Sequence, residues 1–183
     1  HAGHEALPAM HRYVAVRKKA LKLDSLHMYD VYTPLVSLPE KHYTFEEAVD
    51  IACEALKPLG EDYVSALRTG ILEERWVDIM ENKGKTSGAY SFGVYDSDPY
   101  ILMNFKGTLK DIFTLVHEGG HSMHSWYTRK TQPYIYGEHS IFTAEVASTV
   151  NETLLIHYLL QNTDSPEMRK YLINFYIDEF KST

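Results

Sequence analysis

Cysteine is almost absent from this chain of 183 residues, which contains only Cys53. A lone cysteine cannot form an internal disulfide, and it cannot build a metal cluster that needs several thiolates. Nothing in the cysteine usage therefore requires an oxidising compartment.

Long apolar runs are also missing. No stretch approaches the ~20 apolar residues that a membrane-spanning helix needs. The N-terminus lacks the order of a basic segment followed by an apolar one that marks a signal peptide. We therefore expect a cytoplasmic protein with no membrane partner.

Positive charge is scarce as well. Eighteen Lys and Arg residues stand against 25 Asp and Glu residues, which gives a net charge of −7. Contacts to phosphates need clustered Lys and Arg, so we expect no nucleic-acid partner. One basic run, formed by Arg17, Lys18, Lys19 and Lys22, falls on a predicted helix, and we interpret it as a solvated face.

The sequence has neither internal repeats nor low-complexity segments. Its hydrophobic content of 44% and aromatic content of 13% suffice for one sizeable core. We expect residues 1–183 to form a single domain segment. Because the sequence opens without Met and an apolar helical period is still running at Thr183, we expect this segment to belong to a longer chain.

Hydrophobic spacing predicts a mainly α-helical chain with a small β-hairpin or sheet. Capping-box patterns at Thr44 with Glu47 and at Thr108 with Asp111 mark two helix starts. The predicted helices cover about 5–23, 45–56, 61–80, 109–130, 140–161 and a last segment from 165 onward. The predicted strands cover about 87–94 and 100–105.

Three histidines and one glutamate gather in "TLVHEGGHSMHSWY", on the predicted helix 109–130. His117 and His121 are four residues apart, so their imidazoles project from one face of the helix and can share one ion. Glu118 is offset by one residue and can reach a water on that ion without being a ligand. The pattern H-E-x-x-H is the helical signature of zinc peptidases, in which the glutamate acts as general base.

The other residues of this stretch are harder to interpret. Gly119 and Gly120 each cost about 1 kcal/mol in a helix interior relative to alanine, which suggests close approach of another backbone or of a substrate. His124 lies about one turn beyond the expected ion, too far to be a third ligand in a straight helix. We interpret His124 as an outer hydrogen-bond donor or a surface residue.

A third ligand must come from elsewhere, and zinc peptidases often use a glutamate. The candidates after the motif are Glu138 in the connector and Glu145 and Glu152, which are seven residues apart on one face of the next helix. Helix geometry alone leaves both Glu145 and Glu152 within reach of the motif.

The segment "HEGGHSMHSWYTRKTQPYIYGEHSIFTAEVASTVNETLL", with "NKGKTSGAYSFGVYDSDPYILMNF" before it, resembles oligoendopeptidase F and its relatives among the thimet-oligopeptidase-like zinc peptidases. The similarity extends to "HRYVAVRKKALKLDSLHMYDVYTPLV" and so covers most of the chain. It implies a mainly α-helical catalytic domain that encloses a deep channel for short peptides.

The resemblance also implies a set of site residues. One Zn²⁺ per chain would be held by His117, His121 and Glu145, with Glu118 as general base. Glu152 would then accept the second N–H of a ligating histidine. A substrate strand would lie along the edge formed by Ser87, Gly88, Ala89 and Tyr90. The groups that stabilise the oxyanion would lie beyond Thr183.

The function expected from these residues is endopeptidase cleavage of short oligopeptides by a metal-activated water. A non-catalytic scaffold that binds peptides around a structural metal is the alternative, although such a site would have no use for Glu118. The sequence does not reveal the cleavage preference or the oligomeric state.

Overall fold

The computed structural model describes residues 2–36 and 41–182, with side chains described for residues 7–36 and 41–178. The chain divides into two compact units, and the single domain segment expected from the sequence stays a prediction. The first comprises His1–Pro39 with Thr163–Thr183, and the second comprises Glu40–Asn162. Thr183, on which we based the expectation of a longer chain, lies outside the described residues. None of the described helices is long and apolar enough to cross a lipid bilayer.

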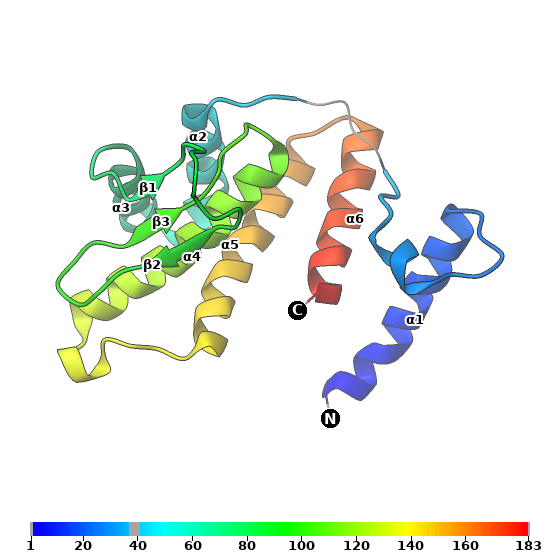
Figure 1. Cartoon of the computed structure of the whole chain (residues 1–183), viewed down its shortest axis with the longest axis horizontal. Coiled ribbons are helices and arrows are strands. Elements are labelled where there is room, and N and C mark those ends of the chain that lie inside the picture. Colours follow the sequence, from blue (N-terminus) through cyan, green and yellow to red (C-terminus); the bar gives the residue numbers. More distant parts are fainter. Residues whose placement is uncertain (1, 37–40, 183) are drawn as a thin grey trace. The chain divides into compact units, whose positions relative to one another are not determined.

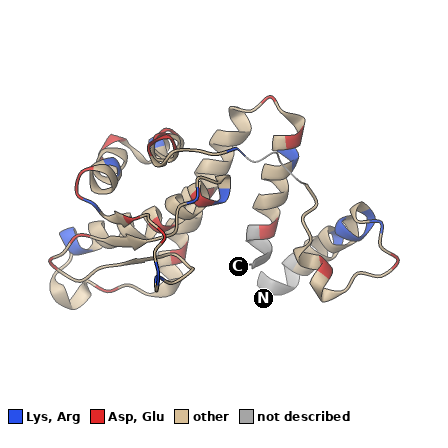
Figure 2. Cartoon of the chain, turned by 45° about the horizontal axis from the view of Figure 1, so that its top comes forward, with Lys and Arg blue, Asp and Glu red and all other residues tan. Residues whose placement is uncertain are grey.

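In the first unit, α1 (Ala2–Ala20) and α6 (Pro166–Ser182) are linked through the buried side chain of Arg17. Its guanidinium donates to the carbonyl oxygens of Asp30 and Thr33 and lies 3.6 Å from the Asp178 carboxylate. The prediction of a solvated basic face is therefore wrong for Arg17, which is 1% exposed. Figure 2 shows the basic residues near the end of α1 and, elsewhere, basic and acidic residues interspersed.

The second unit contains the remaining long helices and the sheet. Its elements are α2 (Phe45–Leu56), α3 (Glu61–Leu72), β1 (Val77–Asp78), β2 (Tyr90–Phe92), β3 (Tyr100–Leu102), α4 (Leu109–Thr131) and α5 (Ile141–Gln161). The strand order is β1-β3-β2, with β1 parallel and β2 antiparallel to β3. The predicted mainly helical fold with a small sheet is confirmed, as are both capping boxes.

The helix predicted for 61–80 ends early, at Leu72. Trp76 instead turns back onto α3 and is 2% exposed. A Cβ on Gly70 would meet the Trp76 ring, so the glycine leaves room for the indole. The segment after Trp76 joins the sheet as β1, where the Trp76 carbonyl accepts from the Ile101 N–H. Burial of one large aromatic side chain thus outweighs continuation of the helix.

Helix α4 runs between the small sheet and α5 (Figure 1). Ile112, Val116 and Met123 are buried along it. Gly120 and Ser122 are about 200° apart around the helix axis, so they face different neighbours. Ser122 meets β2, and Gly120 meets the backbone of α5.

Gly120 marks the closest approach of α4 and α5. A Cβ at this position would lie 2.8 Å from the Cα of Ser148 and 2.9 Å from the carbonyl oxygen of Ala147. The neighbouring Gly119 faces Leu67 instead, where an added Cβ would make an ordinary contact of 3.4 Å. The close backbone approach suggested by the glycine pair is thus confirmed at Gly120.

We predict that Gly119→Ala and Gly120→Ala change stability in opposite directions. Alanine at 119 should gain up to about 1 kcal/mol from helix propensity. Alanine at 120 should lose about 1–3 kcal/mol because it must push the α5 backbone away. Chemical denaturation of both variants in the protein of full natural length measures this difference, and equal midpoints would contradict it.

Candidate metal and catalytic site

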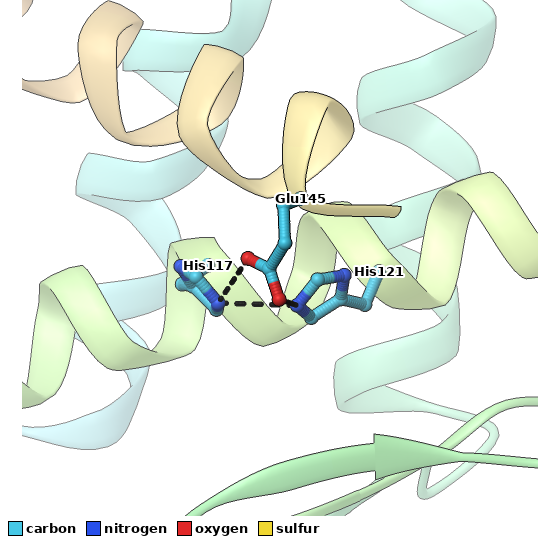
Figure 3. A group of neighbouring side chains, drawn as sticks. All are labelled: His117, His121 and Glu145. Atoms are coloured by element: carbon cyan, nitrogen blue, oxygen red, sulfur yellow. Dashed lines mark hydrogen bonds and ion pairs between the residues drawn. The ribbon is translucent and has the colours of Figure 1, made fainter. Parts of the chain in front are cut away.

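Three side chains from α4 and α5 converge on one point. Nε2 of His117 and Nε2 of His121 are 3.1 Å apart, and the Glu145 carboxylate descends from α5 between the two rings (Figure 3). Its oxygens lie 3.7 Å from Nε2 of His117 and 3.9 Å from Nε2 of His121. Three candidate ligand atoms therefore face one small space, and each side chain is half-buried.

These separations fit a tetrahedral ion. Donor atoms bound to zinc at about 2.0–2.2 Å lie roughly 3.3–3.6 Å from one another in a tetrahedral arrangement. The distances of 3.1, 3.7 and 3.9 Å between the donor atoms of His117, His121 and Glu145 bracket that range. Two imidazoles and one carboxylate also suit Zn²⁺ by ligand chemistry.

Other residues of α5 contact the three side chains on the sides that face away from their shared space. Nδ1 of His117 lies 3.2 Å from a carboxylate oxygen of Glu152, and the main chain of Ala144 lies close to the His121 ring. The Ser148 hydroxyl donates to the Glu145 carboxylate at 3.2 Å. Because an Nδ1–H that bonds a carboxylate fixes the tautomer, Nε2 of His117 keeps its lone pair for an ion.

The two histidines have pKa values that shift in opposite directions. Burial lowers the pKa of His117, but the Glu152 hydrogen bond and the nearby carboxylates outweigh burial, so its pKa is raised overall. Burial lowers the pKa of His121, and the charge of His117 lowers it further. Of the two rings, that of His121 is therefore the one held more readily in the neutral form that a metal requires.

Glu118 is buried and faces β2. It is 7% exposed, and its carboxylate lies close to the backbone of Ser91. Burial raises the pKa of Glu118 overall, although the His117 charge and the Ser91 backbone oppose the rise. A carboxylate with a raised pKa is a stronger proton acceptor than an ordinary glutamate.

Strand β2 lies at an edge of the sheet and is fixed to α4 by a pair of serines. The hydroxyls of Ser91 and Ser122 are 2.8 Å apart. The edge strand differs from the prediction, because Ser87 and Gly88 lie in bends and, of the four predicted residues, only Tyr90 belongs to β2. Three glycines within residues 84–93 interrupt the alternating strand pattern, so the sequence did not reveal that β2 begins at Tyr90.

A buried amide ties the ligand helices together. The Asn151 side chain on α5 donates to the Val116 carbonyl at 3.2 Å and to the Tyr63 hydroxyl at 2.9 Å. Val116 directly precedes His117, so this bond fixes the level of α5 along α4. Sequence reasoning missed both Asn151 and the serine pair, since none of these residues belongs to a recognisable motif.

His124 packs against another histidine. Its ring lies edge-on to that of His139, with ring centroids 4.2 Å apart. Nδ1 of His124 is buried without a hydrogen-bond partner among the described residues. The role of an outer donor to a ligand, predicted for His124, thus finds no supporting contact in this part of the chain. Glu138 is exposed in the connector, outside the group of His117, His121 and Glu145.

Comparison with known sequences identifies close relatives. A family model described as peptidase family M3 matches residues 1–183. The chain is 56% identical over 177 residues to oligopeptidase PepF of Bacillus subtilis (strain 168), which covers 97% of the chain and 26% of the relative. It is 47% identical over 180 residues to the chromosomal oligoendopeptidase F of Lactococcus lactis subsp. cremoris, which covers 98% of the chain and 30% of the relative. The chain thus spans less than a third of these relatives.

Solved structures show the same fold. A crystal structure from Chlamydophila abortus, 46% identical, superposes with a TM-score of 0.85 over 94% of this chain and 29% of that one. A structure of PZ peptidase A with an inhibitor, 21% identical, gives a TM-score of 0.69 over 90% of this chain and 29% of that one. At the lower identity, the likeness concerns the fold alone.

We predict different consequences for the two carboxylates of α5. Glu145→Ala should abolish stoichiometric zinc binding because it removes a ligand atom. Glu152→Ala should weaken zinc affinity by only about 10- to 100-fold because it removes the partner of a ligand. Zinc titration against a competing chelator measures both, and Glu138→Ala should bind like the unchanged protein. The reverse order of effects would exchange the two roles.

Proposed function

Since the chain belongs to peptidase family M3, we propose that it carries the metal centre of a zinc-dependent endopeptidase that hydrolyses internal bonds of short oligopeptides. The observation that carries this proposal is the convergence of His117, His121 and Glu145, with the buried carboxylate of Glu118 on the neighbouring face of α4. The names of the relatives, oligopeptidase PepF and oligoendopeptidase F, support peptides as the substrate class.

His117, His121 and Glu145 would hold one Zn²⁺ per chain. When bound, zinc would lower the pKa of a coordinated water and polarise the scissile carbonyl. Contacts from α5 orient the three proposed ligands: Glu152 lies beside His117, the main chain of Ala144 beside His121, and the Ser148 hydroxyl beside Glu145. The group is therefore organised before substrate arrives. This arrangement limits the reorganisation that the reaction would require.

Glu118 would perform the proton transfers. Its carboxylate accepts a proton from the attacking water and then passes that proton to the departing amine. The raised pKa of Glu118 supports the first of these steps, since a base that is too weak would not take the proton. The Ser91 backbone keeps the carboxylate on the β2 side of the ligands.

The edge of β2 would hold the peptide. An edge strand offers unpaired N–H and C=O groups, and an extended peptide can pair with them as an additional strand. Ser91 connects this edge to Glu118 and to Ser122, so a peptide paired with β2 would lie beside the general base. Cytoplasmic location stays a prediction.

A non-catalytic scaffold with a structural metal is the alternative. Structural zinc sites usually have four protein ligands, whereas catalytic sites have three and leave one position for water. The group found among the described residues has three members, His117, His121 and Glu145. Three ligands, together with a buried glutamate beside them, favour catalysis.

We predict that Glu118→Gln separates metal binding from turnover. In the protein of full natural length, this variant should retain one equivalent of zinc by elemental analysis. It should lose about 10²–10⁴-fold in kcat because a general base typically contributes that much. A quenched fluorescent peptide reports the rate, and the exposed Glu73→Gln provides a matched control. Near-normal turnover of Glu118→Gln would show that the proton acceptor is another group.

A further inference from the structure

Buried nitrogen atoms without hydrogen-bond partners gather near the connector between α4 and α5. In the part of the chain that the structure describes, such atoms occur in Arg17, Trp76, His124, Arg129 and His139. Three of these residues, His124, Arg129 and His139, lie at the end of α4 or in the connector. Buried polar atoms are rarely left unpaired, so a cluster of them indicates that a polar partner belongs there.

Arg129 is the strongest of these donors. Its Nη2 donates to the carbonyl oxygen of Gly93 at 2.7 Å, while its Nη1 is buried and unpaired. A Cβ on Gly93 would lie 2.5 Å from Nη1, so the glycine lets the guanidinium sit against the backbone that follows β2. Among the described residues, no ion pair involves Arg129. A half-buried guanidinium without a carboxylate partner is suited to bind one.

The guanidinium lines a cavity of about 540 Å³. Residues 91–95 at the end of β2 form one wall, Ser125 and Arg129 of α4 form the floor, and connector residues between 134 and 139 form the other wall. Ser125 offers a further hydroxyl donor. Glu138 also lines the cavity, but it is exposed and makes no ion pair with Arg129.

This cavity lies further along α4 than the candidate active site. Glu118, Ser122, Ser125 and Arg129 follow one another at helical spacing along one face of α4. Ser91 contacts the first two of these residues and also lines the cavity. The eleven helical steps from Glu118 to Arg129 span about 16 Å along the helix, which equals about five residues of an extended peptide.

We propose that Arg129 binds a carboxylate of the oligopeptide substrate, about five residues from the cleaved bond. The inference rests on the function proposed above and adds a position at which that substrate is recognised. Nη1, buried against Gly93, is the guanidinium nitrogen left without a partner, while the Gly93 carbonyl accepts from Nη2 and holds the other side of the guanidinium in place. The carboxylate is either the free C-terminus of the peptide or an acidic side chain within it.

Two pairs of quenched peptides test the proposal and distinguish these two sources. The first pair ends about five residues after the cleaved bond, with either a free carboxylate or an amide. The second pair is amidated and extends further, with Glu or Gln at that position. Both pairs are assayed on the zinc-loaded protein of full natural length, on Arg129→Gln and on Lys130→Gln. The last variant removes an equal charge at the next residue, whose ammonium lies over the Trp126 ring at 4.3 Å.

We expect the unchanged protein to prefer the acid form of at least one pair by about 10- to 100-fold in KM, as charge-assisted hydrogen bonds imply. Arg129→Gln should remove this preference by raising KM for the acid form, with kcat and the amide form little changed. Lys130→Gln should keep the preference. A preference for the acid form in the first pair identifies the peptide C-terminus as the bound carboxylate. The same preference in the second pair identifies an acidic side chain.

Two results would overturn the proposal. One is an equal KM for the acid and amide forms of both pairs on the unchanged protein. The other is an equal rise in KM for the acid and amide forms in Arg129→Gln, together with a lower melting temperature. That result would mean that Arg129 pairs with a carboxylate of the protein itself. If no peptide is cleaved, the proposed function fails; fluorescence anisotropy with the same peptides then decides whether Arg129 binds their carboxylates.

Discussion

The approach of α5 to α4 at Gly120 is the constraint on which the candidate site depends. A carboxylate side chain is short, so Glu145 reaches the two imidazoles only because no Cβ separates the helices at that level. Ser148, which occupies the space beside Gly120, also donates to Glu145. Asn151 fixes the register of the same contact through the Val116 carbonyl. The close packing of α4 against α5 therefore also sets the positions of the three candidate ligand side chains.

The two faces of α4 have different tasks. His117 and His121 point toward α5, where the Glu152 carboxylate lies 3.2 Å from Nδ1 of His117 and the main chain of Ala144 lies close to the His121 ring. Glu118 and Ser122 face β2, where a single residue, Ser91, contacts both. The offset of one residue within H-E-x-x-H rotates the glutamate by about 100°, and this rotation places it on the strand side. Under the proposed function, a helix between a partner helix and an edge strand would serve metal and peptide at once.

The features predicted correctly from the sequence are those that depend on neighbours along the chain. The capping boxes at Thr44 and Thr108 and the shared face of His117 and His121 follow from helical periodicity alone. The choice between Glu145 and Glu152 could not follow from it, because both residues lie on one face of α5. Which carboxylate lies beside the Nε2 atoms of His117 and His121 depends on the distance between two helices, and no local pattern encodes this distance.

The errors have the same origin. Arg17 was assigned to a solvated face because its partners at Asp30, Thr33 and Asp178 are distant along the chain. The helix predicted through Met80 ends at Leu72 because Trp76 fills the space over Gly70. The short β1 that follows has two residues, too few to produce an alternating pattern.

The shortness of β2 has a consequence for the departure of cleaved fragments. An edge of three residues, Tyr90–Phe92, offers few main-chain hydrogen bonds to a bound strand. An intact peptide can supplement those bonds with contacts on both sides of the cleaved bond, whereas each fragment retains only the contacts of its own half. Hydrolysis would therefore divide the binding free energy between two weakly held pieces. A longer edge strand would hold its products more firmly and slow the release that each new cycle requires.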